Sequence, residues 1–128
     1  MHPADLTRRD LLGERIFTGE NAVYDALTMG ENRTRSSIIL VDAETDAGAI
    51  LVSGPWVEYT GELPVTRGHA DEHQAKQKRM SDWPALRFAL RGIAHGKFAL
   101  HHRAFHDDGN PVVLYDGTQL GYEGLVLT

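Results

Sequence analysis

The stretch SSIILVDAETDAGAILV, residues 36–52, gives the clearest fold signal in the chain. Four apolar residues at 38–41 run together without the gaps of an amphipathic helix, which predicts a buried strand over 36–42. Residues 44–48 have turn composition, and residues 49–52 return as a second strand. The pattern therefore predicts a β-hairpin in the first half of the chain.

The sequence on either side of this hairpin predicts two helices before it and one short strand after it. Residues 3–17 begin with a proline suited to a first helical turn, and Leu6, Leu12 and Ile16 can share one face. Thr18 is a candidate cap for a second helix that ends at Gly30. Residues 56–59 alternate apolar and polar side chains and predict a third strand.

The second half repeats the order of helix followed by strands. Residues 68–80 are so polar that they fit either an exposed helix or a mobile loop. Residues 82–96 predict a firmer helix, because Leu86, Leu90 and Ile93 fall on one face. Turn sequences at 107–110 and 116–117 separate three further strands at 98–106, 111–115 and 122–127.

These elements predict an α+β fold, in which antiparallel β-hairpins pack against two or three helices in the order α-α-β-β-β-α-β-β-β. The elements do not alternate as β-α-β, so the order gives no indication of a parallel sheet. The length of 128 residues predicts one globular domain over 1–128. The predicted core consists of Val23, Leu27, Ile38, Leu40, Ile50, Val52, Leu86, Leu90, Ile93, Phe98, Leu100, Val113 and Leu125.

The composition is that of an ordinary small soluble domain, with 41% hydrophobic and 24% charged residues. Cysteine is absent, so disulfides, thiolate metal sites and cysteine nucleophiles are excluded. No apolar run approaches the roughly 20 residues that cross a bilayer, and the first residues do not resemble a secretory signal. We therefore expect a cytoplasmic protein that does not enter a membrane.

A basic, histidine-rich central segment stands out in this acidic chain, whose formal net charge is −5. Residues 67–103 carry eight basic and three acidic side chains, and six of the seven histidines lie within 67–106. The segment can present cations to an anionic ligand, such as a nucleotide or another phosphate-bearing molecule, or to an acidic protein partner. The alternative is that these cations only neutralise acidic neighbours. The candidate ligand-binding residues are Arg87, Arg91, Lys97, His101 and Arg103.

The sequence His69-Ala70-Asp71-Glu72-His73 matches the H-x-x-E-H pattern of inverted zinc peptidases. On a helix, His69 and His73 point the same way and can share a zinc or another divalent metal, with Glu72 as a base. The alternative reading is a solvated polar helix face. Apart from this metal, we expect no cofactor.

No phosphate-binding loop, dinucleotide-binding glycine pattern or serine nucleophile elbow occurs, so we assign no catalytic residue. The leading hypothesis is a non-enzymatic binding, regulatory or inhibitor module. The rival is a small metal-dependent hydrolase built on His69, Glu72 and His73. Sequence-specific nucleic-acid binding is not expected, and self-association through exposed strand edges stays open.

Overall fold

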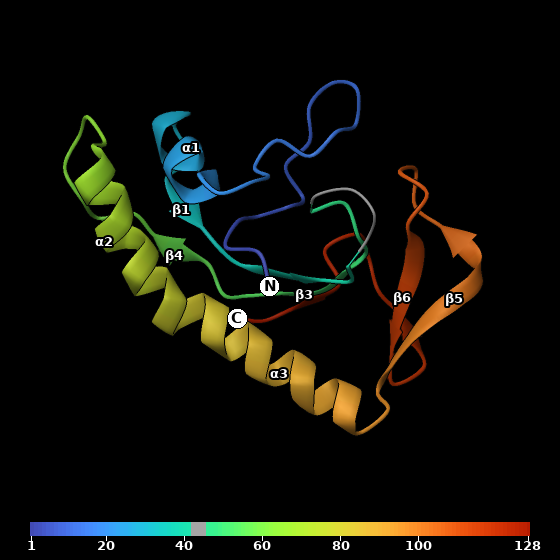
Figure 1. The fold of residues 1–128 in the computed structure, drawn as a ribbon. Coiled ribbons are helices and arrows are strands. Elements are labelled where there is room, and N and C mark those ends of the chain that lie inside the picture. The colour runs from blue at the N-terminus through green and yellow to red at the C-terminus, as the bar shows by residue number, and fades with distance from the viewer. Residues whose placement is uncertain (42–45) are drawn as a thin grey trace.

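The computed structural model describes residues 1–41 and 46–128 and confirms the α+β fold (Figure 1). The helices are α1 (Ala22–Thr28), α2 (Arg67–Gln77) and α3 (Trp83–Ala94). The strands are β1 (Arg33–Thr34), β2 (Ser37–Ile39), β3 (Ile50–Ser53), β4 (Val57–Glu58), β5 (Phe98–Phe105), β6 (Pro111–Tyr115), β7 (Thr118–Gln119) and β8 (Leu125–Val126).

The predicted hairpin forms the centre of the structure, as β2 and β3 pair antiparallel. Of the turn predicted over residues 44–48, residues 44–45 lie outside the described residues. The C-terminal strand β8 then pairs with β3 in parallel, with Val52 opposite Leu125. This parallel pair differs from the antiparallel sheet that the sequence predicts, because pairing between strands so far apart leaves no local signal. A second antiparallel sheet has the order β5-β6-β7, and β1 pairs with β4.

The predicted helix over 3–17 does not form, and this segment is an irregular loop that begins beside β2. His2 forms an antiparallel bridge with Ser37, and both backbone hydrogen bonds between them measure 2.8 Å. Asp10 Oδ1 accepts the backbone N–H groups of Leu12 and Glu14 at 2.9 and 3.0 Å. Side chains that bond nearby backbone donors compete with helix formation, which explains the loop.

The polar segment 68–80 is helical. Thr66 caps α2 by accepting the backbone N–H of His69. A π-helical turn, η1 (Lys78–Asp82), joins α2 to α3, and the three elements run as one long rod along one side of the molecule (Figure 1). Within the described residues, no helix has the length and apolar character needed to cross a bilayer.

Helix α3 packs with a face different from the one the sequence predicts. Ala85, Ala89 and Gly92 are buried against the core, whereas Leu86, Leu90 and Ile93 are 36, 57 and 54% exposed. Both sets have the same helical spacing, so periodicity alone does not separate them. The small side chains let the helix approach closely, and a Cβ at Gly92 would lie 2.5 Å from the Phe98 ring.

The rest of the predicted core is mostly correct. Leu100 is 46% exposed, and Leu40, Phe98 and Leu125 are partly buried. The predicted core residues that are buried are Val23, Leu27, Ile38, Ile50, Val52 and Val113.

Candidate functional site

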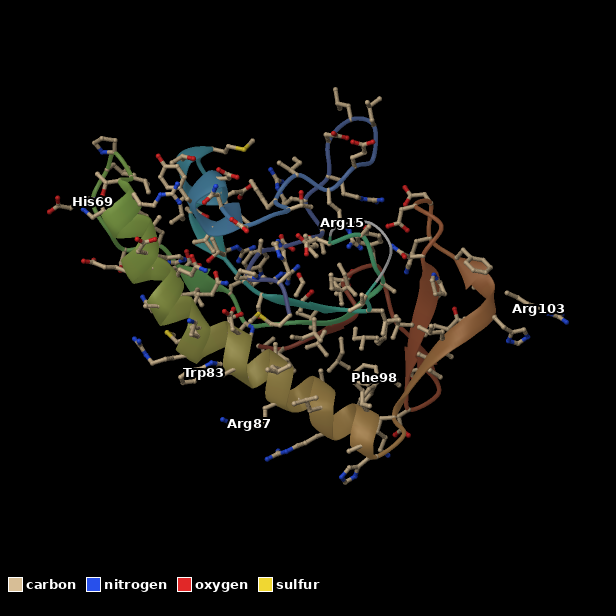
Figure 2. All side chains as sticks on the ribbon, in the orientation of Figure 1. Arg15, His69, Trp83, Arg87, Phe98 and Arg103 are labelled. Atoms are coloured by element: carbon tan, nitrogen blue, oxygen red, sulfur yellow. The ribbon has the colours of Figure 1, made fainter. Side chains whose placement is uncertain are left out.

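The structure spreads the five predicted ligand residues over α3, the connection that follows it and β5. Arg87 and Arg91 are exposed on α3, and Lys97 pairs with Asp116 at 3.4 Å. His101 and Arg103 lie on β5, and Figure 2 shows the side chains of Arg87 and Arg103 far apart and directed away from the body of the molecule. None of the three cavities described below, within the described part of the chain, is lined by any of the five.

His69 and His73 have partners within the fold. His69 Nδ1 accepts the backbone N–H of Thr66 at 3.4 Å and so helps to cap α2. His73 is buried, its Nε2 lies 2.7 Å from Thr34 Oγ1, and its ring meets Tyr59 edge-on. Both line a cavity of about 300 Å³, but no three metal-ligating side chains converge anywhere in residues 1–41 and 46–128. The described residues therefore do not assemble the donor set that catalytic zinc needs.

A different histidine has the geometry of an acid–base group. His2 is only 5% exposed, and its backbone is held in the bridge to Ser37. Its Nδ1 lies 3.4 Å from Asp46 Oδ2, and its Nε2 lies 2.8 Å from the carbonyl oxygen of Phe17. Acceptors thus face both ring nitrogens, and the ring can donate to both only as the imidazolium. The pair of His2 and Asp46 combines a proton donor with a carboxylate that can stabilise its charge.

Asp46 connects this pair to a polar cavity of about 320 Å³. Its Oδ2 also accepts the backbone N–H of Gly19 at 2.9 Å, and Arg15 Nη1 donates to its backbone oxygen at 2.6 Å. Figure 2 shows Arg15 where the N-terminal loop, to which it belongs, approaches the rest of the fold. The other cavity residues are Gly13, Glu14, Thr18, Ala47 and Asp108. A small polar molecule in this cavity would lie beside Asp46.

A second carboxyl group, Asp82, lies within electrostatic range of His2 and is 1% exposed. Burial raises the pKa of Asp82, and the hydrogen bond from Gln77 Nε2 at 3.1 Å partly opposes that rise. Gln77 Nε2 also lies 3.0 Å from the carbonyl oxygen of Pro3, the residue after His2. The last residue of α2 therefore supports the segment that carries His2.

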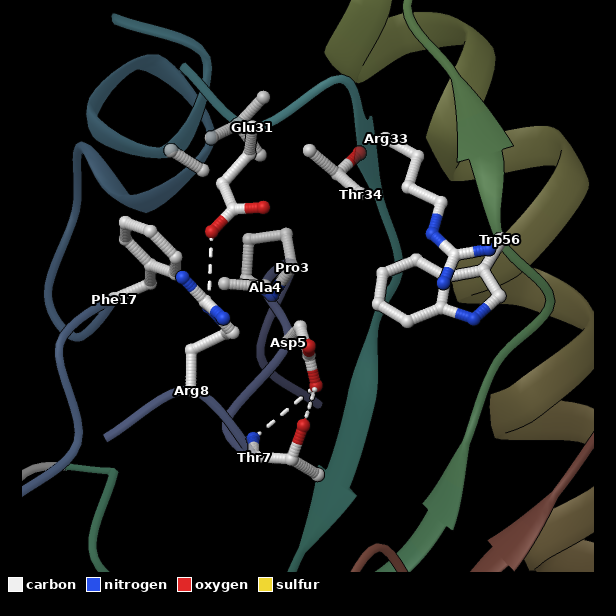
Figure 3. Close-up of a pocket in the computed structure, with 12 residues that line it drawn as sticks. Pro3, Ala4, Asp5, Thr7, Arg8, Phe17, Glu31, Arg33, Thr34 and Trp56 are labelled. Atoms are coloured by element: carbon white, nitrogen blue, oxygen red, sulfur yellow. Dashed lines mark hydrogen bonds and ion pairs between the residues drawn. The ribbon is translucent and has the colours of Figure 1, made fainter. Parts of the chain in front are cut away.

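Another cavity, of about 250 Å³, begins at the residues that follow His2 (Figure 3). Arg8 pairs with Glu31 at 2.9 Å on one side, and the guanidinium of Arg33 stacks 4.0 Å from the Trp56 ring on the other. Neither His2 nor Asp46 lines this cavity. It is therefore separate from the acid–base pair.

Sequence reasoning missed His2 because it concentrated on the histidine-rich segment 67–106. Nothing local links His2 to Asp46. The two residues come close because His2 forms a bridge with Ser37, the first residue of β2, and because Asp46 lies between β2 and β3 in the sequence. A histidine beside proline near the start of the chain was the only sequence signal.

No family model matches the chain, and no curated protein matches it. Solved structures do share its fold. One is a phosphoribosylglycinamide formyltransferase (purN) from Coxiella burnetii, with a TM-score of 0.65 and 22% identity over 99% of this chain and 49% of that chain. Another is a phosphoribosylglycinamide formyltransferase from Anaplasma phagocytophilum, with a TM-score of 0.65 and 21% identity over 99% of this chain and 50% of that chain. The present chain thus spans about half the length of these enzymes.

These neighbours correct the leading functional hypothesis from the sequence. A non-enzymatic module that presents residues 67–106 to an anionic partner is contradicted, because the fold is shared over 99% of the chain with enzymes. At this level of identity the likeness shows the fold alone. An enzymatic role is compatible with that fold.

Proposed function

We propose that this chain takes part in the transfer of a formyl group to an amine, with His2 and Asp46 as its acid–base pair. The observation that carries the proposal is the contact of 3.4 Å between His2 Nδ1 and Asp46 Oδ2, in a fold shared with two formyltransferases. The cavity beside Asp46 gives a small reactant access to that carboxylate, whereas His2 is buried and is not among the residues that line the cavity.

Formyl transfer needs the proton movements that such a pair can supply. The amine nitrogen attacks the formyl carbon, and the carbonyl oxygen takes on negative charge. The nitrogen then loses a proton, the bond to the donor breaks, and the departing group takes up a proton. The Asp46 carboxylate, which lines the cavity, can accept the proton that the nitrogen loses and return it to the departing group, and His2 against its Oδ2 orients that carboxylate.

The electrostatics of the cavity also support an amine acceptor. Glu14, Asp46 and Asp108 line it against one cation, Arg15. Hydrogen bonds from Asn110 and Tyr122 lower the pKa of Asp108 despite its burial, so it is ionised at neutral pH. The resulting negative potential favours the amine end of an acceptor in this cavity.

Transfer to phosphoribosylglycinamide, the acceptor in the neighbours' names, provides the direct test. We expect His2→Gln and Asp46→Asn to lower the rate of formylated product, measured by mass spectrometry with nitrogen-, oxygen- and sulfur-linked formyl donors. The loss should be about 10²–10⁴-fold for His2→Gln, as for other acid–base groups.

The matched control is His95→Gln, which removes an exposed histidine at the end of α3. It should leave the rate unchanged. Because the neighbours are about twice as long, acceptor binding is measured alongside turnover, through the backbone amide signals of Gly19 and Asp46. A wild-type chain that neither binds the acceptor nor forms product contradicts the proposal, as does a His2→Gln variant with full activity.

A further inference from the structure

Asp46 has a backbone conformation that the fold must hold in place. Its φ is 55°, in the left-handed region that side chains with a Cβ rarely adopt. Such residues persist only where surrounding contacts over-determine them, and they cluster at functional sites. The contacts around Asp46 therefore indicate what fixes its carboxylate against His2.

Three hydrogen bonds from distant segments converge on residues 46–47. Arg15 Nη1 donates to the Asp46 carbonyl oxygen at 2.6 Å, and Asn110 Nδ2 donates to the Ala47 carbonyl oxygen at 2.7 Å. The backbone N–H of Gly19 donates to Asp46 Oδ2 at 2.9 Å. Two of these donors are side chains, so substitution can remove them without changing Asp46 itself.

The two side-chain donors are themselves joined through Tyr122 and Asp108. Arg15 Nε donates to the Tyr122 hydroxyl at 2.8 Å, and that hydroxyl donates to Asp108 Oδ2 at 2.7 Å. Asp108 in turn accepts the backbone N–H and Nδ2 of Asn110, both at 3.0 Å. Burial and the Asp108 carboxylate raise the pKa of Tyr122, so its hydroxyl keeps the proton that this chain of bonds requires.

Burying the Arg15 side chain for these contacts leaves one of its nitrogens without a hydrogen bond among the described residues. Its side chain is 7% exposed, and within the described residues its Nη2 has no hydrogen-bond partner, with Asp108 Oδ2 3.9 Å away. A buried guanidinium nitrogen without a hydrogen bond is unfavourable. The other two nitrogens, Nη1 and Nε, donate hydrogen bonds to Asp46 and Tyr122. These two bonds offset the free-energy cost of burying the side chain.

We infer that Arg15 and Asn110 are positioning residues that hold Asp46 in its left-handed conformation, with its carboxylate against His2. Both residues act through their hydrogen bonds to the backbone of residues 46–47 and not through a hydrogen bond to His2. The inference rests on the proposed role of the His2–Asp46 pair. It couples the turn between β5 and β6, which carries Asp108 and Asn110, to the site.

The Gly19 backbone amide reports this positioning without any substrate, because its acceptor is Asp46 Oδ2. We expect Asn110→Ala and Arg15→Met to speed hydrogen exchange at Gly19 by about tenfold or more, towards the rate in Asp46→Ala. In the transfer assay we expect kcat to fall about 10–100-fold with little change in KM. Arg15→Lys keeps one donor and should restore part of both losses.

Two controls separate positioning from general stability. Asp116→Asn alters the next turn of the same sheet, between β6 and β7, and should leave Gly19 exchange and kcat unchanged. In an Asp46→Asn background, Asn110→Ala should cause no further loss of kcat, since its effect passes through Asp46. If Arg15→Met does not fold, Asn110→Ala still decides the matter.

The exchange readout distinguishes this inference from the proposed function. Unchanged Gly19 exchange in folded Asn110→Ala overturns the positioning role, whatever the activity. If Gly19 exchange becomes faster in Asn110→Ala but the wild-type chain catalyses no transfer, the positioning role is supported. Only the proposed formyl transfer is then contradicted.

Discussion

Arg9 and Asp107 form an ion pair that ties the N-terminal loop to the turn between β5 and β6, with Arg9 Nη1 2.6 Å from Asp107 Oδ1. The same guanidinium lies 4.4 Å from the centre of the Tyr122 ring. The hydrogen bond with Asp107 raises the pKa of Arg9, so the guanidinium keeps its positive charge. The loop over residues 7–15 contains no helix or strand, and these contacts help to anchor it together with those of Arg8 and Arg15.

The first prediction concerns the strength of this anchor. We expect Arg9→Gln to lower the free energy of unfolding by about 1 kcal/mol, because it removes a partly exposed ion pair and a cation–π contact together. Asp107→Asn removes only the ion pair and should cost less, with an effect that shrinks in high salt. Urea denaturation measures both. Arg79→Gln, at an exposed arginine that bonds only its own helix, is the control. If Arg9→Gln and Arg79→Gln change the free energy of unfolding equally, the prediction is wrong.

The second prediction concerns pH and His73. Burial lowers the pKa of His73, and the nearby Lys76 lowers it further, so the fold prefers the neutral ring. The unfolded chain takes up this proton near pH 6.5. Unfolding therefore binds a proton in mild acid, and the free energy of unfolding should fall as the pH drops below about 6.5.

Comparing variants isolates this effect in urea titrations between about pH 5 and pH 8. His73→Gln should lose the His73 part of the slope, whereas His95→Gln, at an exposed site, should keep the wild-type slope. An unchanged slope in His73→Gln would show that another group is responsible.

The third prediction concerns the buried carboxyl group of Asp82. Its folded-state pKa is raised chiefly by burial, so the stability present with the protonated group is lost as the pH rises through that pKa. Asp82→Asn removes the charge and keeps an oxygen that can accept from Gln77. The variant should therefore gain stability relative to the wild type between about pH 4 and pH 7. Asp71→Asn, exposed on α2, should show no such trend, and a less stable Asp82→Asn at pH 7 would refute the explanation.

The fourth prediction compares two helical glycines by thermal and urea unfolding. Gly92→Ala should destabilise the protein by about 1–3 kcal/mol, because the new Cβ meets the Phe98 ring between α3 and β5. Gly68→Ala should stabilise α2 by about 0.5 kcal/mol, since its Cβ would meet only Thr66 Oγ1, at 3.8 Å. The two effects should have opposite signs. Stabilisation by Gly92→Ala would mean that Phe98 moves aside freely.

How far the sequence predicts this fold depends on the range of the interactions. Strands β2 and β3 are predictable because their composition and the turn between them act within a few residues. The packing face of α3 was predicted wrongly, because small and large residues share the same spacing and only the distance to the sheet decides between them. The weak apolar pattern over 3–17 predicted a helix. The segment forms a loop instead, because the hydrogen bonds that Asp10 accepts from the nearby backbone compete with helix formation.

The candidate site depends almost wholly on long-range contacts. The sequence drew attention to residues 67–106, where charge and histidines are dense along the chain, but density along the chain does not bring side chains together in space. His2, Arg15, Asp46 and Asn110 come from four separate segments. No spacing rule relates them.

The sequence by itself determined the α+β class, the central hairpin and the helices within residues 18–30 and 82–96, because these follow from side-chain patterns that neighbouring residues impose on the backbone. Only the tertiary structure decided that β8 joins β3 in parallel, that α3 buries its small residues and that His2 meets Asp46. Those outcomes depend on surfaces that meet only after the chain has closed loops of many residues. The competing arrangements differ in packing and hydrogen bonding between distant segments, which no local pattern records.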